Sequence, residues 1–214
     1  MSHIAVIDYG MGNLRSVSKA LETVANGVAV EVTADPDRIL SASHIVFPGV
    51  GAMRDCVAEL TRLQLDTVLR DVIESGKPVL GICLGMQALL TSSEENKGTQ
   101  GLGIISGSVC HFDIQATDNG EHLKVPHMGW NEVHQVHPHP LWQDIPQDSR
   151  FYFVHSYFVS PNDDAVTAAT TAYPDNFSSA VHKNNLFAVQ FHPEKSQHAG
   201  LKLLENFLNW DGQS

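Results

Sequence analysis

Short apolar runs and longer periodic segments alternate along the first part of the chain. The runs are bounded by glycine, proline or polar residues and predict buried strands at 3–8, 28–32, 44–47 and 78–82. Between them, apolar residues recur at helical spacing and predict helices over 14–25, 53–74 and 84–90, with a short helical piece after Asp35. This alternation predicts a parallel sheet that helices cover on both faces.

The pattern changes after Thr91, where a polar, turn-rich segment leads into a series of short strand-like runs. These runs lie at 107–112, 124–136, 151–161, 166–171, 179–182 and 186–191. They predict antiparallel hairpins added to the sheet, and an amphipathic helix over 201–210 closes the chain. The expected fold class is α/β, a doubly wound, mostly parallel sheet with antiparallel additions in the C-terminal half. Because no repeat or linker interrupts the sequence, we expect a single domain over 1–214.

Composition narrows the classes of function. The chain has 214 residues, enough for one large α/β domain, and its net charge of -11 argues against nucleic acid or an anionic membrane as partner. The N-terminus enters a strand pattern directly, without a signal-like segment, and the longest charge-free apolar stretch, 78–90, is too short to cross a bilayer. Three scattered cysteines predict reduced thiols and a cytoplasmic protein.

Cys83 stands where a predicted strand turns directly into a predicted helix, with Gly81 and Gly85 two residues to either side. This G-x-C-x-G pattern has the form of a nucleophile elbow with sulfur in place of oxygen. The tight turn leaves no room for a Cβ at either glycine, and a helix N-terminus favours the thiolate. The backbone amide of Leu84 could donate to an oxyanion. Taken alone, the pattern is equally consistent with a buried structural thiol.

Ligands of doubly wound sheets bind at the carboxyl ends of the strands. Three glycine-bearing strand ends are expected there: Gly10-Met11-Gly12, Pro48-Gly49-Val50-Gly51 and the segment around Cys83. The first lacks the third glycine of a dinucleotide fingerprint and any Walker lysine. We therefore favour a tight turn over a phosphate loop at that position.

A cysteine nucleophile needs a histidine, and the histidine needs a group that orients it. Among twelve histidines, His192 stands apart because it ends a predicted strand and Glu194 follows two residues later. In extended chain, residues i and i+2 point the same way, and Pro193 keeps His192 out of helical geometry. These residues predict a Cys83–His192–Glu194 triad. The alternative is an ordinary surface ion pair ahead of a helix.

The other histidines make weaker cases. His134, His137 and His139 lie close together, but two prolines interrupt the run and no cysteine or carboxylate lies among them, which argues against a metal site. His155 alternates with large apolar residues on a predicted strand and could line a pocket.

Three segments resemble, in order, the signature blocks of the class I (triad-type) glutamine amidotransferases: 48–51, 81–87 and 190–194. Segment 125–131, taken with 155–157 and 191–196, resembles the glutaminase subunits of imidazole glycerol phosphate synthases within that family. The likeness covers essentially the whole chain. It implies hydrolysis of L-glutamine to glutamate and ammonia, without a cofactor or metal.

The resemblance also implies roles for individual residues. Cys83 would attack the side-chain amide, His192 would transfer the proton, and Glu194 would orient His192. Backbone amides of Val50 and Leu84 would form the oxyanion hole. The residues expected to line the substrate are Gly49, Gly51, Gln87, His155, Ser156 and Tyr157.

By the same resemblance, the ammonia would pass to a separate (β/α)8-barrel cyclase subunit, in a heterodimer that serves L-histidine biosynthesis. Residues 128–130 and 10–13 would face this partner, with Met128 and Trp130 exposed for it; the alternative places both in the core. Two other functions stay open: a glutaminase for another synthase, such as anthranilate synthase, and a free-standing hydrolase of peptides or γ-glutamyl compounds. A non-catalytic scaffold is disfavoured because Cys83, His192 and Glu194 are all present.

Overall fold

The computed structural model describes residues 3–113 and 124–213. Within them, a twelve-stranded mixed sheet forms the centre and a two-stranded sheet lies apart from it. One half of the large sheet is parallel, in the order β2-β1-β3-β4-β14. Its strands are β1 (His3–Ile7), β2 (Ala29–Thr33), β3 (His44–Gly49), β4 (Val79–Cys83) and β14 (Leu186–Val189).

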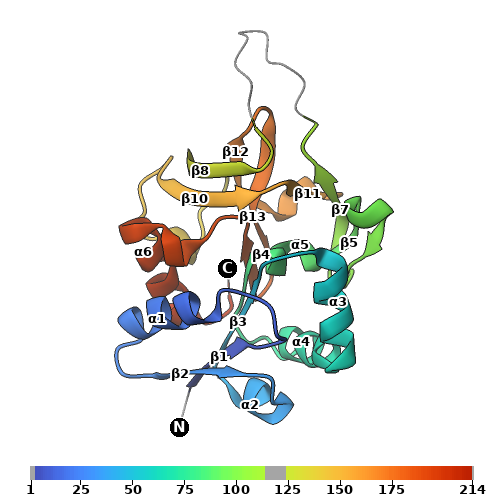
Figure 1. Cartoon of the computed structure of the whole chain (residues 1–214). Coiled ribbons are helices and arrows are strands. Elements are labelled where there is room, and N and C mark those ends of the chain that lie inside the picture. The colour runs from blue at the N-terminus through green and yellow to red at the C-terminus, as the bar shows by residue number, and fades with distance from the viewer. Residues whose placement is uncertain (1–2, 114–123, 214) are drawn as a thin grey trace.

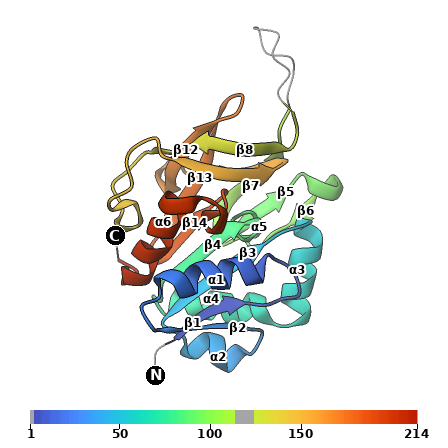
Figure 2. The same ribbon diagram turned by 60° about the vertical axis from the view of Figure 1, so that its left-hand side comes forward.

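Helices cover both faces of this parallel half (Figure 1). On one face lie α1 (Leu14–Val24) and α6 (Gln197–Asn209), which bury Leu21 and Phe207 in one core cluster. On the other face lie α2 (Pro36–Ser41), α3 (Met53–Arg62) and α4 (Leu65–Glu74), which bury Leu60 and Leu69 in a second cluster. Figure 2 shows the same two layers from the side of α1. The predicted doubly wound α/β fold is confirmed.

The additions continue the sheet beyond β14. Antiparallel pairs join β13 (Asn176–Lys183), β11 (Tyr157–Pro161) and β7 (Ile105–His111), but β5 (Leu90–Ser93) pairs parallel with β7, contrary to the expected antiparallel hairpins. The short strand β6 (Thr99–Gln100) pairs antiparallel with β5, β12 (Thr167–Ala172) pairs with β13, and β9 (His134–Gln135) pairs with β12. For segment 186–191 the expected arrangement was only half right. After its hairpin with β13, β14 runs parallel to β4, so it belongs to the parallel core.

Two predicted helices are wrong in extent. The helix expected over 53–74 breaks at Gln64, whose φ of 59° is left-handed, into α3 and α4. The periodicity runs across the break because both helices bury apolar residues in the same core cluster. The helix expected over 84–90 ends early as α5 (Leu84–Ala88), and Leu90 already begins β5. Residues 84–90 are all buried, and a continuous apolar run does not distinguish helix from strand.

The strand expected over 151–161 divides at Ser156 into two strands of different sheets. The first part, β10 (Arg150–His155), pairs antiparallel with β8 (His127–Glu132), and His155 lies opposite His127. The second part is β11, in the large sheet. Figure 1 shows β8 and β10 crossing the end of the large sheet at which β4 leads into α5. The corner at Ser156 therefore lies beside the strand end that carries Cys83.

Four short 3-10 helices complete the described elements: Glu95–Lys97, Pro140–Trp142, Asp164–Val166 and Pro193–Lys195. None of the helices in the described part of the chain is both long enough and apolar enough to cross a membrane.

Candidate active site

Cys83 occupies a sharp turn between β4 and α5. Its φ of 55° and ψ of -111° are strained for a residue with a side chain, as at nucleophile elbows. The flanking glycines make the turn possible. A Cβ on Gly85 would lie 2.0 Å from the Phe47 carbonyl oxygen, and a Cβ on Gly81 would lie 2.9 Å from the Ala188 Cβ. The G-x-C-x-G pattern thus reflects close backbone packing that fixes the thiol at the end of the central strand.

His192 comes from the strand next to β4. The sequence placed it at the end of a strand running to 191, but β14 ends at Val189. His192 keeps an extended conformation because its N–H donates to the Tyr152 carbonyl at 2.9 Å. Its Nδ1 lies 2.9 Å from Oε1 of Glu194, and both side chains are almost fully buried. The alignment expected from the i, i+2 spacing is therefore present, and the pair does not lie on the surface.

Two anionic neighbours determine the charge of the His192 ring. Burial by itself lowers the pKa of this imidazole, but the Cys83 thiolate and the Glu194 carboxylate outweigh burial and raise the pKa to about 10. Nε2 of His192 faces the Cys83 sulfur and makes no other hydrogen bond within the described residues. A protonated ring beside a thiolate is suited to deliver a proton to a leaving group.

The segment after β3 runs beside the elbow. The Tyr9 hydroxyl is buried and donates to the Pro48 carbonyl at 3.0 Å. Val50 and Leu84 both line the cavity in front of Cys83. Gly49 is buried and is not among the residues that line the cavity, and a Cβ there would lie 2.5 Å from the Tyr9 hydroxyl oxygen; its expected role beside the substrate stays a prediction.

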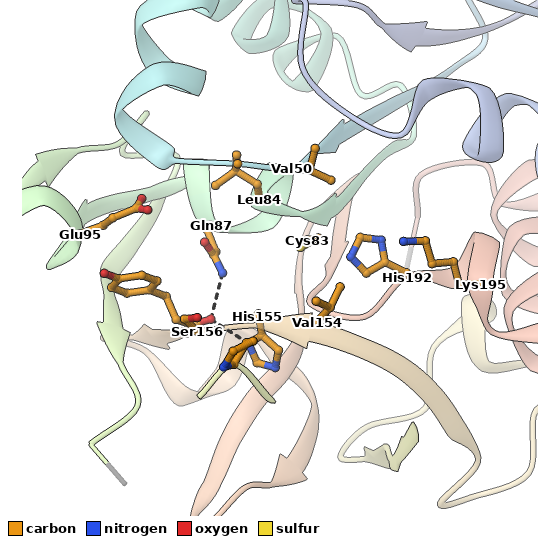
Figure 3. A pocket seen from close by; sticks show the side chains of 13 residues that line it. Val50, Cys83, Leu84, Gln87, Glu95, Val154, His155, Ser156, His192 and Lys195 are labelled. Atoms are coloured by element: carbon orange, nitrogen blue, oxygen red, sulfur yellow. Dashed lines mark hydrogen bonds between the residues drawn. The ribbon is translucent and has the colours of Figure 1, made fainter. Parts of the chain in front are cut away.

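A cavity of about 390 Å³ opens in front of Cys83. Figure 3 shows Cys83 between Gln87 and His192, with Glu95 and Lys195 at opposite sides. The lining residues are Val50, Gly51, Cys83, Leu84, Gln87, Glu95, Pro126, Val154, His155, Ser156, Tyr157, His192 and Lys195. All the predicted site residues are among them except Gly49 and Glu194, and Glu194 lies behind His192.

Sequence reasoning missed four lining residues, Glu95, Pro126, Val154 and Lys195, and one residue behind the lining, Gln190. Lys195 and Gln190 stand inside the segments that carry the family resemblance, 190–194 and 191–196, so a signal for them existed. Glu95 stands in a polar turn with no recognisable pattern. Its carboxylate accepts a hydrogen bond from the Met53 amide at 2.7 Å, a contact between distant segments that no local spacing encodes.

Two further buried histidines lie on the side opposite His192, where His155 lines the cavity and His127 bonds to it from outside the lining. His155 Nδ1 donates to the Tyr157 carbonyl at 2.8 Å, so its Nε2 must accept, and His127 Nδ1 donates to it at 2.8 Å. His127 Nε2 in turn accepts from the Asn131 side-chain amide at 3.2 Å. Burial lowers the pKa of His127 to about 4 and that of His155 to about 3. Both rings are therefore neutral, with defined tautomers.

The remaining candidates do not form a site. Within residues 3–113 and 124–213, no group of three or more His, Cys, Asp and Glu side chains is arranged to hold a metal ion. His134 lies 2.8 Å from an Asp148 carboxylate oxygen. Gly10 and Gly12 form a turn with φ values of 83° and 126°, as the sequence favoured.

Met128 and Trp130 lie on β8 and are 61% and 42% exposed. The alternative that placed them in the core is therefore wrong. Two large apolar side chains so exposed on one short strand form an apolar surface of the kind that binds another protein.

The chain matches the family model described as "Glutamine amidotransferase class-I" over residues 5–210. A relative from Nitrosococcus oceani, named imidazole glycerol phosphate synthase subunit HisH, is 58% identical over 214 residues and covers 100% of both chains. A relative of the same name from Methylococcus capsulatus is 59% identical over 213 residues, which are 99% of this chain and 98% of that one.

Solved structures resemble the fold at lower identity. The structure titled PurLQS from Thermotoga maritima aligns with a TM-score of 0.73 at 20% identity and covers 97% of this chain and 98% of that one. The glutaminase domain of Trypanosoma brucei CTPS, with bound acivicin, gives a TM-score of 0.64 at 18% identity, with 100% of this chain and 98% of that one covered. Sequence, fold and the matched family model agree, and this chain belongs to the class-I glutamine amidotransferase family.

Proposed function

We propose that this chain is the glutaminase subunit of an imidazole glycerol phosphate synthase in L-histidine biosynthesis, working in the cytoplasm. It hydrolyses L-glutamine to glutamate and ammonia. The observation that carries the proposal is that Cys83, at a strained strand-to-helix turn, and the buried His192–Glu194 pair meet at one cavity. The full-length relatives that carry the name of this subunit support the same assignment.

The reaction follows from the positions of these groups. The Cys83 thiolate attacks the side-chain amide carbon of glutamine, and backbone amides of Val50 and Leu84 stabilise the oxyanion. His192 gives its proton to the departing nitrogen, so ammonia leaves and a glutamyl thioester remains. A water then gives a proton to His192 while its oxygen attacks the thioester. The carbon–sulfur bond breaks, which releases glutamate and restores the thiolate.

The charges around the cavity suit an amino acid as substrate. Free glutamine carries an ammonium and a carboxylate, and apart from Cys83 and His192 the lining holds one acidic and one basic side chain, Glu95 and Lys195. Glu95 is fixed by its hydrogen bond from the Met53 amide. We infer that Glu95 receives the ammonium, which leaves the amide end of glutamine directed at Cys83.

The partner we propose is a (β/α)8-barrel cyclase subunit that takes up the ammonia. Met128 and Trp130 project from β8, the strand that pairs with β10, and β10 supplies Val154 and His155 to the cavity wall. A partner bound on this surface lies one strand away from the cavity. It can therefore receive ammonia and influence the site.

The test is glutamate release from glutamine by this chain alone, and by the chain with the barrel cyclase and its nucleotide ligand. We expect low release alone and a large increase in the complex, with Cys83→Ser inactive under both conditions. High release alone, unchanged by the cyclase, would contradict the proposal and favour a free-standing hydrolase. Stimulation by the synthase subunit of anthranilate synthase, and not by the cyclase, would move the chain to another pathway.

A further inference from the structure

A continuous set of hydrogen bonds links the 155–157 corner to the sulfur of Cys83. The Gln87 side-chain nitrogen lies 3.0 Å from the Tyr157 carbonyl oxygen and 3.0 Å from Oε1 of Gln190. The Gln190 side-chain nitrogen lies 3.6 Å from the Cys83 sulfur. Figure 3 shows Gln87 reaching from α5 toward this corner. The side-chain amides of Gln87 and Gln190, which are far apart in the sequence, thus form consecutive hydrogen bonds that end at the Cys83 sulfur.

The Tyr157 backbone carbonyl fixes which group donates and which accepts in each of these hydrogen bonds. The Tyr157 carbonyl can only accept a hydrogen bond, and it accepts from both Gln87 and His155. The Gln87 amide must therefore turn its NH2 toward that carbonyl, and the second hydrogen of the same NH2 reaches Gln190. Gln190 must then present its oxygen to Gln87 and its NH2 to the sulfur. A reversed Gln190 would set its NH2 against the NH2 of Gln87 and its oxygen against the sulfur.

Burial keeps water from replacing these bonds. Gln190 is 0% exposed and Gln87 is 7% exposed, whereas the substrate side of Cys83 is open to the cavity. A buried N–H that points at sulfur favours the negatively charged thiolate over the neutral thiol, because a charged acceptor makes the stronger hydrogen bond.

We propose that Gln190 is a further catalytic residue, which donates a hydrogen bond from its side-chain amide to the Cys83 thiolate in an orientation imposed by Gln87 and the Tyr157 carbonyl. This inference deepens the proposed glutaminase function and rests on it for the identity of the substrate. The hydrogen bond to sulfur, however, can be tested without glutamine.

The experiment measures alkylation of Cys83 by iodoacetamide as a function of pH, in a Cys110→Ser background because Cys110 is half-exposed. Gln190→Met keeps the length of the side chain and removes its donor. We expect the alkylation rate at pH 7 to fall about tenfold, with the pH midpoint of alkylation moving upward. Glutamine turnover should fall by a similar factor in kcat, with KM little changed.

Two more variants distinguish the effect of the orientation of the Gln190 amide from the effect of altered side-chain packing. Gln190→Glu keeps the shape of the side chain and replaces the donor by an acceptor, so its midpoint should move further upward. Gln87→Glu does not touch sulfur, but it removes the donor that orients Gln190 and should move the midpoint in the same direction. The other titratable groups that interact with Cys83, His192 and more weakly Tyr9, are unaltered in every variant.

Gln135→Met is the matched control. The Gln135 amide also donates to backbone carbonyls, those of Ile145 and Pro146, but it lies in β9, outside the cavity lining. Its alkylation profile should match that of the unsubstituted chain.

The outcomes are distinct. Alkylation profiles of Gln190→Met or Gln190→Glu that superimpose on the parent, in protein with an unchanged circular dichroism spectrum, overturn the proposal. If Gln190→Met does not fold, the isosteric Gln190→Glu decides by the same criterion. Shifted profiles in a chain that hydrolyses no glutamine, even in the complex, would support the thiolate contact and reject the proposed function.

Discussion

Two buried histidines, His192 and His155, line the same cavity, but the His192 ring is protonated and the His155 ring is neutral. His192 is 2% exposed and lies against the Glu194 carboxylate and the Cys83 sulfur, and its pKa is raised to about 10. His155 is 6% exposed and lies between a backbone carbonyl and the neutral ring of His127, and its pKa is lowered to about 3. Burial acts in the same direction on both rings.

The difference teaches that the hydrogen-bond partner, and not the depth of burial, decides what a buried imidazole can do. Anionic partners stabilise the imidazolium and outweigh desolvation, whereas a carbonyl and a second neutral ring do not. His192 is therefore protonated at neutral pH and can donate its proton to a leaving group. His155 serves as a fixed donor and acceptor that holds the 155–157 corner in place.

The strongest test of the comparison is to remove the charged ring. His192→Asn should lower glutaminase kcat by about a thousandfold or more, because the proton donor to ammonia is lost. The measurement is glutamate release in the complex. His137→Asn changes an exposed histidine in the segment after β9, outside the cavity lining, and is the matched control, expected to retain full activity. A loss of less than tenfold in His192→Asn would show that another group moves the proton.

The next test removes the anion and keeps the ring. Glu194→Gln preserves the size of the side chain and an oxygen for His192 Nδ1, but not the negative charge. We expect kcat to fall by about a hundredfold or more. Because the carboxylate raises the pKa of His192, its loss should also move the basic limb of the kcat/KM profile to lower pH. A profile that keeps its basic limb would indicate that Glu194 does not set the charge of the ring.

A substitution in the neutral pair should affect stability more than catalysis. His127→Phe retains an aromatic ring between Tyr173 and Phe153 but leaves His155 Nε2 without its donor. We expect the free energy of unfolding in urea to fall by about 1–3 kcal/mol. The kcat should change less than tenfold and the pH profile should not move. A shifted profile would mean that the pair takes part in proton transfer.

The smallest expected effect is a fall in the free energy of unfolding as the pH is lowered. His127 and His155 have lowered pKa values in the folded chain, so they stabilise it above about pH 6.5 and less as the pH falls toward about 4. Above about pH 6.5 the raised pKa of His192 gives the opposite slope, so the comparison is made below that pH, where the His192 ring is largely protonated in both folded and unfolded chains. Urea titrations at pH 6.0 and 5.0 should show lower stability at pH 5.0. His127→Phe should reduce the slope by up to about 1 kcal/mol per pH unit. An unchanged slope would argue against a neutral His127.

The sequence predicted those parts of the site whose chemistry is local. The elbow depends on glycines within two residues of Cys83, and the base depends on two residues that share one side of an extended chain, His192 and Glu194. The parallel half of the fold was predictable for the same reason, since most of its strands are short continuous apolar runs and its helices have an apolar period of their own.

The features of the site and of the fold that the sequence did not predict depend on contacts between distant segments of the chain. The Gln87–Gln190 pair, the position of Glu95 and the division of 151–161 at Ser156 are all set by which strands lie side by side. Continuous runs of aromatic and apolar residues stand on both sides of His155-Ser156, so the sequence reads as one strand and does not show the turn from one sheet to the other. The burial of Gly49 likewise follows from the ring of Tyr9, which the sequence places far away.

The order of the strands also has a consequence for how the protein is made. The nucleophile ends β4, but the base follows β14, which pairs directly with β4 although it lies near the other end of the chain. During translation, Cys83 leaves the ribosome long before His192 and Glu194 exist. A nascent or C-terminally truncated chain therefore carries a thiol without its proton donor. Under the proposed mechanism, such a chain does not release ammonia before the last hairpin is inserted beside β4.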